Sequence, residues 1–90
     1  MSQRIVVAAA EAACPTSTGT ASTFGSATCV RLVNTTSTAR LVTVVEEQSG
    51  TVLGSFTLLG NTVEFLQKRS SHCIFAAANT VLGTKVGFTN

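Results

Sequence analysis

The chain has 90 residues, and a chain of this length buries only about 60–65% of its unfolded surface, which is too little for two separate cores. Charged residues make up 11% of the sequence, against roughly 25% in an average domain, so we expect partner subunits to cover part of the surface. The net charge of +2 comes from scattered cations, and Trp and Tyr are absent, which argues against nucleic acid as the main partner.

The N-terminal stretch before Cys14 has a cation, an apolar run and small residues, as a short secretory signal does. Glu11 ends the apolar run before it reaches the roughly 7–15 residues of a signal core. No stretch approaches the ~18 consecutive apolar residues of a membrane span. We therefore predict a strand over residues 5–10, in a chain that is neither exported nor inserted in a membrane.

The rest of the chain alternates strands with turns, because β-branched residues are dense and helix formers are sparse. A Thr/Ser/Gly-rich loop over residues 15–27 is the longest loop, and such loops are often functional or reach a neighbouring subunit. A short helical turn near Ala12 stays open, since alanine favours helix. Further strands are predicted at residues 28–34, 40–46, 51–58, 62–68, 72–78 and 85–89. About seven short strands predict an all-β fold, a small antiparallel β-sandwich or barrel that forms a single β domain over residues 1–90.

Alternation within the strands predicts which side chains face the core. Val63 and Phe65 point opposite to Glu64 and Lys68, which is the pattern of a half-buried strand. In the last strand the same reasoning directs apolar side chains inward, here Val86 and Phe88.

The strand over residues 72–78 has apolar residues on both of its faces, with Cys73 on one and Ile74 on the other. This pattern fits a strand that is covered by sheet on one side and by a partner on the other. His72 and Cys73 are adjacent, but neighbours in an extended strand project to opposite faces, which argues against a catalytic dyad and for a strand-entry histidine beside a buried cysteine.

Two segments share the order cysteine, apolar strand, Asn-Thr and then a cation, at residues 29–40 and 73–85. Asn-Thr is a common turn pair. We therefore predict two hairpins of similar shape.

Zinc ligands of the right types are present in Cys14, Cys29, Cys73 and His72, but no two of these residues have a familiar zinc-ligand spacing. Three cysteines cannot close a disulfide framework within one chain. We expect reduced thiols in a cytosol, and pairing between chains stays open.

Few residues could act as general acids or bases, since Asp is absent and two of the four glutamates are an adjacent pair at a strand end. The glycines form no phosphate-binding motif. The threonines lack the fixed short repeat that an ice-binding or polysaccharide-binding array needs. The sequence therefore predicts no enzyme activity, no catalytic residue, no cofactor and no metal.

Several stretches of the chain look familiar as a set. They are the Thr/Ser/Gly loop, Cys-Val-Arg-Leu-Val-Asn-Thr-Thr at residues 29–36, Gly-Asn-Thr-Val-Glu-Phe-Leu-Gln-Lys at residues 60–68 and Lys-Val-Gly-Phe-Thr-Asn at residues 85–90. Together they resemble small uncharacterised all-β proteins encoded by marine tailed bacteriophages, over roughly the whole chain.

The resemblance implies a virion component that is made in the host cytoplasm. The expected role is a capsid decoration or cement protein that binds the major capsid protein or other virion proteins and forms a homo-oligomer. The alternatives are a neck or tail ring subunit of the virion and a free carbohydrate- or host-binding β module.

The candidate partner contacts lie in the long loop and in the first predicted hairpin. Arg31 and Arg40 stand on the two arms of that hairpin and could approach each other and Glu46 or Glu64. An ion pair within the chain and a contact with a partner are both compatible with this placement. The loop contributes three candidate contacts, Thr18, Thr20 and Thr23.

Overall fold

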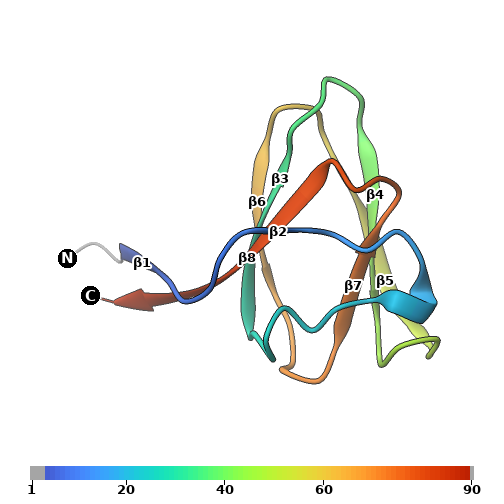
Figure 1. The fold of residues 1–90 in the computed structure, drawn as a ribbon, viewed down its shortest axis with the longest axis horizontal. Coiled ribbons are helices and arrows are strands. Elements are labelled where there is room, and N and C mark those ends of the chain that lie inside the picture. Colours follow the sequence, from blue (N-terminus) through green and yellow to red (C-terminus); the bar gives the residue numbers. More distant parts are fainter. Residues whose placement is uncertain (1–3, 90) are drawn as a thin grey trace.

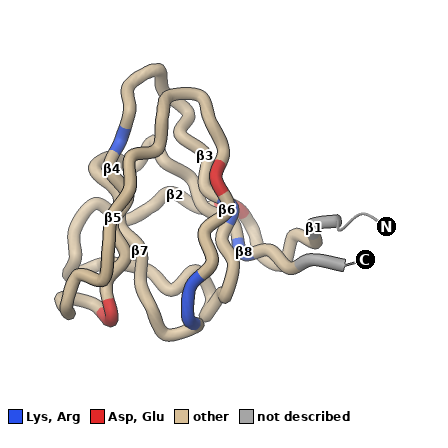
Figure 2. Tube along the Cα trace, turned by 180° about the vertical axis from the view of Figure 1, so that it is seen from behind, with Lys and Arg blue, Asp and Glu red and all other residues tan. Residues whose placement is uncertain are grey.

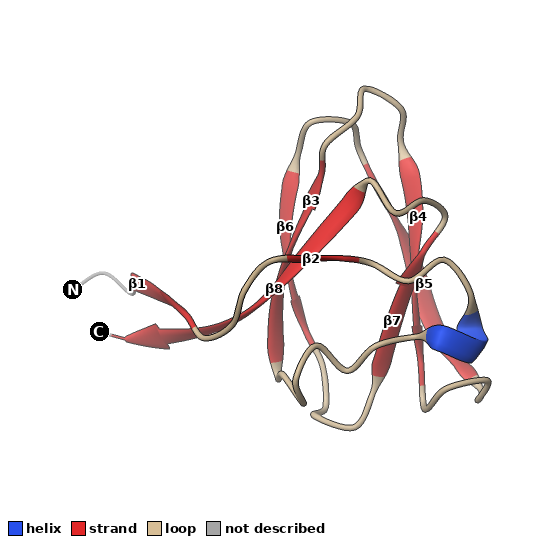
Figure 3. Ribbon diagram, in the orientation of Figure 1, coloured by secondary structure: helices blue, strands red, loops and turns tan. Residues whose placement is uncertain are grey.

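Eight strands form two antiparallel sheets in the computed structural model, which describes residues 4–89 (Figures 1 and 3). Most of them are rich in valine, threonine and other residues that suit a pleated, half-buried surface. In chain order the elements are β1 (Arg4–Val7), β2 (Ala12–Ala13), the short 3₁₀ helix η1 (Thr18–Thr20), β3 (Cys29–Asn34), β4 (Arg40–Val45), β5 (Val52–Leu58), β6 (Val63–Gln67), β7 (Cys73–Ala76) and β8 (Val81–Thr89).

The two sheets pack face to face as a sandwich, which confirms the predicted all-β fold (Figure 1). The larger sheet has the order β1-β8-β3-β6, with β2 also paired to β8, and the smaller sheet has the order β5-β4-β7. Strands β4 and β5 pair as a hairpin. The chain crosses from one sheet to the other after β3, β5, β6 and β7.

The two predicted hairpins are wrong as hairpins, because both connections are arches between the sheets. Strands β3 and β4 lie in different sheets, and so do β7 and β8. The two arches lie side by side, since β3 pairs with β8 (Val30 opposite Lys85) while β4 pairs with β7 (Val42 opposite Ala76). The two similar segments therefore form two arches, and the strands of one arch pair with the strands of the other in both sheets.

Asn34 gives the physical reason for the first arch. Its side chain is fully buried, and its Nδ2 donates to the carbonyl of Thr38 at 2.7 Å and to the carbonyl of Leu58 at 3.0 Å. Its Oδ1 accepts from the backbone N–H of Thr36 at 3.1 Å and from the Thr36 hydroxyl at 2.9 Å. This one amide thus forms hydrogen bonds with the backbone of the chain that crosses between the sheets and with β5 of the other sheet. A hairpin turn within one sheet would not need the bond to β5.

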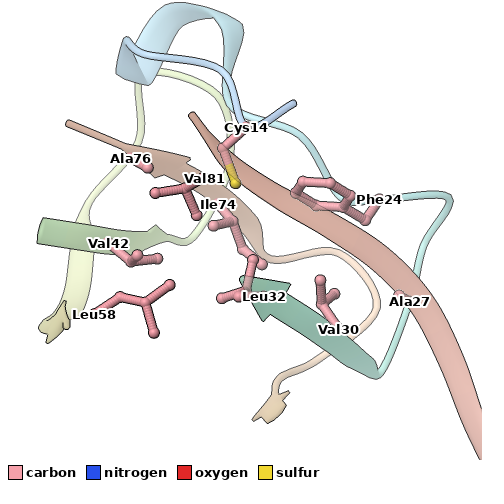
Figure 4. Packing of buried hydrophobic residues seen from close by; sticks show 10 residues of the cluster. All are labelled: Cys14, Phe24, Ala27, Val30, Leu32, Val42, Leu58, Ile74, Ala76 and Val81. Atoms are coloured by element: carbon pink, nitrogen blue, oxygen red, sulfur yellow. The ribbon is translucent and has the colours of Figure 1, made fainter. Parts of the chain in front are cut away.

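The core lies between the sheets and collects the inward residues of both. Phe24 enters it from the loop that precedes β3 (Figure 4). Burying one leucine or isoleucine there is worth about 1.5–3 kcal/mol. The members of the cluster are Cys14, Phe24, Ala27, Val30, Leu32, Val42, Leu58, Ile74, Ala76 and Val81.

Gly83 lets β8 approach the Phe24 ring closely. A Cβ at this position would lie 2.6 Å from Cε1 of Phe24 and 3.2 Å from Cδ2 of Leu32. We predict that Gly83→Ala lowers the free energy of unfolding by about 1–3 kcal/mol, because overpacking forces neighbouring side chains to shift. Urea denaturation measures the effect. Gly87→Ala in the same strand is the control, since a Cβ there meets nothing within 4 Å, and equal losses in both variants would contradict the packing argument.

Strand β6 is present as predicted, but its faces are the reverse of the expected ones. Val63 and Phe65 are 39% and 45% exposed, whereas Leu66 packs against the core and Lys68, just after the strand, is buried. Glu64 lies on the inner face, opposite Leu32, and stays exposed because β6 is the edge strand of the larger sheet. Alternation of apolar and polar residues predicts the wrong buried face here, because Lys68 points inward and its hydrogen bonds are satisfied there.

The ends of the chain differ from the predicted strands in length. Strand β8 begins at Val81, earlier than predicted, while β1 ends at Val7. Val86 is buried as predicted, and the side chain of Phe88 lies outside the described residues. The helical turn that stayed open near Ala12 is not there, because Ala12 lies in β2, and the short helix η1 falls within the 15–27 loop, where none was predicted.

Candidate functional site

The loop over residues 15–27 runs along the edge of β7. Ser22 and Ile74 exchange two backbone hydrogen bonds, of 3.0 and 2.8 Å. The N–H of Ala76 donates to the carbonyl of Pro15 at 2.9 Å. The loop thereby closes one edge of the smaller sheet with its own backbone.

The outer face of β7 is covered by the same loop. Ala21, Val45 and Cys73 form a second small cluster, against which Phe75 packs. Ile74 lies on the opposite face, in the main core. The apolar residues on both faces of this strand are therefore explained within the chain, without the partner that the sequence suggested.

His72 and Cys73 mark the entry to this strand. The N–H of His72 donates to the carbonyl of Arg69 at 3.0 Å, and the Cys73 thiol lies 3.8 Å from the carbonyl oxygen of Ser71. Cys73 is 5% exposed and, like Cys14 and Cys29, carries a free thiol. These contacts give the pair a structural role at the start of β7.

Lys68 holds the end of the 15–27 loop through backbone carbonyls. Its Nζ donates to Ala27 at 2.7 Å, to Thr23 at 3.0 Å and to Arg69 at 3.3 Å. The loop carbonyls are gathered by a turn in which residues 24–26 all have positive φ, a conformation that costs non-glycine residues free energy. Burial lowers the pKa of Lys68 below its usual value, and Cys73 opposes that shift.

We predict that Lys68→Met lowers the free energy of unfolding by about 2 kcal/mol, because the carbonyls of Thr23 and Ala27 lose a charged donor. Methionine has a side chain of similar length, and it removes the free-energy cost of burying an ammonium group, which offsets part of the loss. Urea denaturation at pH 7 measures the change, and limited proteolysis reports opening of the loop. Lys85→Met is the matched control, because Lys85 donates only to the exposed carbonyl of Gly25, at 3.0 Å; if that variant loses as much stability, the role given to Lys68 is wrong.

The two candidate arginines lie on different sheets. Arg31 on β3 pairs with Glu11 at 3.4 Å, with side chains 33% and 41% exposed, and not with the expected Glu46 or Glu64. An exposed pair of this kind contributes about 0–1 kcal/mol. Arg40 on β4 is half-buried, and its Nε is buried without a hydrogen-bond partner among the described residues.

The three candidate threonines of the loop have different surroundings. Thr18 and Thr20 are exposed in η1, where the Thr20 hydroxyl hydrogen-bonds Ser17 at 2.9 Å. The Thr23 hydroxyl accepts from the N–H of Ser26 at 3.1 Å, so it serves the turn. Partner contacts through Thr18 and Thr20 remain predictions.

The outer face of the larger sheet has a shallow hollow beside Phe65. It is lined by Thr28, Cys29, Phe65 and Gln67. Burial raises the pKa of Cys29, and a protonated thiol is a poor nucleophile. The side chains that line the hollow are two polar ones, one thiol and one aromatic ring.

Sequence reasoning missed two exposed apolar parts of the fold. One is an arm, formed by β1 and residues 86–89 of β8, that projects from the sandwich (Figures 1 and 3). In it Val6 is 46% and Val7 is 64% exposed. The other is β5, where Val52 is 59% and Leu53 is 49% exposed. Figure 2 shows the few charged residues scattered over the sandwich, with none along β5.

The described part of the chain has neither a cluster of metal ligands nor a membrane-spanning helix. Within residues 4–89, no three His, Cys, Asp or Glu side chains lie close enough together to hold a metal ion. None of the helical segments in that range is long and apolar enough to cross a bilayer. No protein-family model matches the chain, and neither a curated protein nor a solved structure is significantly similar to it. The chain folds as a small antiparallel β-sandwich with a projecting arm formed by β1 and the end of β8.

Proposed function

We propose that the chain is a non-enzymatic structural protein of a phage virion, which decorates and cements the capsid through contacts with capsid protein and with copies of itself. The observation that carries the proposal is the projecting arm with its exposed valines, because an arm with two open edges is built to contact another chain. The virion setting in this proposal rests on the resemblance of the sequence to small proteins of marine tailed bacteriophages.

The surface of the sandwich supports a role in assembly. Exposed Val52, Leu53, Val63 and Phe65 give it apolar patches, while charged residues make up only 11% of the sequence. Protein interfaces are depleted of charge at their centres and depend on shape and hydrogen bonding. A decoration protein that binds an assembled shell fits such a surface.

Mass spectrometry of purified particles tests the proposal. We expect the chain in the particles in a fixed ratio to the major capsid protein, and we expect particles that lack it to lose their genome at a lower temperature. Absence of the chain from purified particles would overturn the proposal.

A neck or tail ring subunit is the second candidate, and the placement of the arm favours it. The arm and β5 lie at opposite ends of the long axis of the molecule, so a contact between them runs head to tail, and such contacts form a ring where the rotation between copies closes (Figure 1). Copy number separates the two roles, because a ring holds few copies and a decorated shell holds many.

A further inference from the structure

The arm lacks the partners that stabilise a strand pair. Residues 81–85 of β8 pair with β3, but residues 86–89 pair with β1 alone. An isolated two-stranded ribbon is only marginally stable in water and needs a third strand or an apolar cover. Val6 and Val7 receive little cover from their own chain.

In β1, the backbone N–H and C=O groups of every second residue point to the open edge of the strand, away from β8. Ala8 donates its N–H to the carbonyl of Lys85 at 2.9 Å, and the register places Val6 opposite Gly87. Bonded and non-bonded pairs alternate along an antiparallel ladder. The N–H and C=O of Val7 therefore point away from β8, toward the open edge.

At the other end of the molecule, β5 has a neighbour on one side only, which is β4. The N–H of Ala77 donates to the carbonyl of Leu41 at 2.9 Å, so odd-numbered residues of β4 bond toward β7 and even-numbered ones bond toward β5. Gly54 lies opposite Val44 and takes part in that ladder. The backbone of Ser55 consequently points to the open edge.

Among the described residues, neither edge is guarded by proline, by a covering segment or by a row of charged residues, which protect many natural edge strands from pairing. The pairing of β4 with β5 shifts register between Val44 and Val45, so β5 has one irregularity, and its regular part beyond it, over residues 54–58, is the segment open to pairing. Strand β5 contains no charged residue and no proline, and β1 contains one charged residue, Arg4, at its start. The edge of β7, by contrast, is covered by the 15–27 loop.

Two glycines mark the same two places. A Cβ at Gly54 in β5 or at Gly87 in the arm would meet nothing within 4 Å. Glycine inside a strand costs about 0.5–1 kcal/mol relative to alanine, and it permits another backbone to approach closely. The register shift beside Gly54 gives glycine a local role in β5, since strand glycines often mark such irregularities, whereas no close contact within the described chain requires glycine at Gly87.

We propose that β1 of one copy adds as a strand to the open edge of β5 in a second copy of this chain. The occupant is a second copy because each chain carries both halves of the contact, an apolar strand with an open edge and an unguarded strand to receive it. The two halves lie at opposite ends of the long axis (Figures 1 and 2), so the contact is head to tail and each copy can join two others. The inference deepens the proposed function by naming the contact between copies, and it rests on that function only for its biological setting.

Sedimentation velocity of the purified chain over a range of concentrations tests the contact. We expect wild-type protein to form larger species as concentration rises. Val7→Pro and Ser55→Pro each remove an N–H that points to an open edge, and each should weaken association by about ten-fold or more, the loss expected from one interface hydrogen bond and its neighbours. Val7→Thr and Ser55→Thr keep the N–H and should associate as the wild type does. Val7→Lys and Leu53→Lys are a second pair that keeps the test valid should a proline variant fail to fold.

Mixing the two defective chains gives the sharpest result. A Val7→Pro chain keeps an intact β5 and a Ser55→Pro chain keeps an intact arm, so the mixture should form dimers that grow no further. A mixture that stays monomeric would overturn the proposal, and so would wild-type protein that stays monomeric at every concentration. If Ser55→Pro associates normally while Val7→Pro does not, β5 is not the acceptor. These readings use the purified chain alone, so they are independent of whether it is found in virions.

Discussion

Replacing Asn34 by alanine should lower the free energy of unfolding by about 3 kcal/mol, because a fully satisfied buried amide is lost, including its hydrogen bond to the carbonyl of the buried Leu58. The carbonyl of Thr38 and the N–H of Thr36 lose hydrogen bonds of 2.7 and 3.1 Å, and the carbonyl of Leu58 loses one of 3.0 Å. Urea denaturation at pH 7 measures the loss.

Two variants separate the role of the amide from a general sensitivity of the arches. Asn79 takes the equivalent place in the second arch but is exposed, so Asn79→Ala should change stability by no more than about 0.5 kcal/mol. Asn34→Asp keeps the acceptor oxygens and replaces the Nδ2 donor by an oxygen that faces two carbonyls. Burial beside those carbonyls raises the pKa of the new carboxyl, so the stability lost at neutral pH should be partly regained as the pH falls and the carboxyl becomes a donor. Equal losses in Asn34→Ala and Asn79→Ala would refute this role.

The strands could be predicted from the sequence, but their partners could not. Dense β-branched residues between turn signals predicted the all-β fold and nearly every strand, because those patterns are local. The same Asn-Thr pair serves a hairpin and an arch equally well, and what decides between them is where the amide of Asn34 finds its acceptors. One of these acceptors, the carbonyl of Thr38, is local, but the other, the carbonyl of Leu58, lies 24 positions away in the chain, and no local pattern reports it.

Alternation located β6 but not its buried face. Hydropathy assigns Lys68 to solvent and Phe65 to the core, whereas the structure buries Lys68 and leaves Phe65 45% exposed. The cause is again a set of distant acceptors, the carbonyls of Thr23 and Ala27, which satisfy the ammonium inside the protein. Residues whose burial depends on such partners are the ones that sequence patterns place wrongly.

The position of the candidate contact surface could not be predicted from the sequence. The low content of charge, a property of the whole composition, leads us to expect a partner chain but does not locate its contact. The positions of the arm and of β5 depend on strand order, and strand order follows from the arches. The loop over residues 15–27, the most conspicuous segment in the sequence, turns out to use part of its backbone to close the edge of β7.

Alkaline pH should destabilise the protein through Cys14. This thiol lies in the main core at 1% exposure, and burial raises its pKa from 9.0 to about 12. An unfolded chain releases the thiol proton near pH 9 while the folded chain keeps it, so the stability contribution is complete below pH 9 and is lost as the pH rises toward 12. At about 1.4 kcal/mol for each unit of pKa shift, the loss between pH 9 and pH 11 is about 2–3 kcal/mol. Lys68 opposes this loss below pH 10.5, since its lowered pKa makes the folded chain release a proton before the unfolded chain does.

Cys14→Ala tests this origin, because alanine cannot ionise. The variant should be less stable than the wild type at pH 7 by about 1 kcal/mol, owing to the small cavity, and should then lose little more as the pH rises. The two curves of unfolding free energy against pH, measured by urea denaturation under reducing conditions, should therefore converge or cross above pH 9. Cys29→Ala is the matched control, since Cys29 is only half-buried and burial raises its pKa less far. Parallel curves for Cys14→Ala and the wild type would show that another group governs the alkaline limit of the fold.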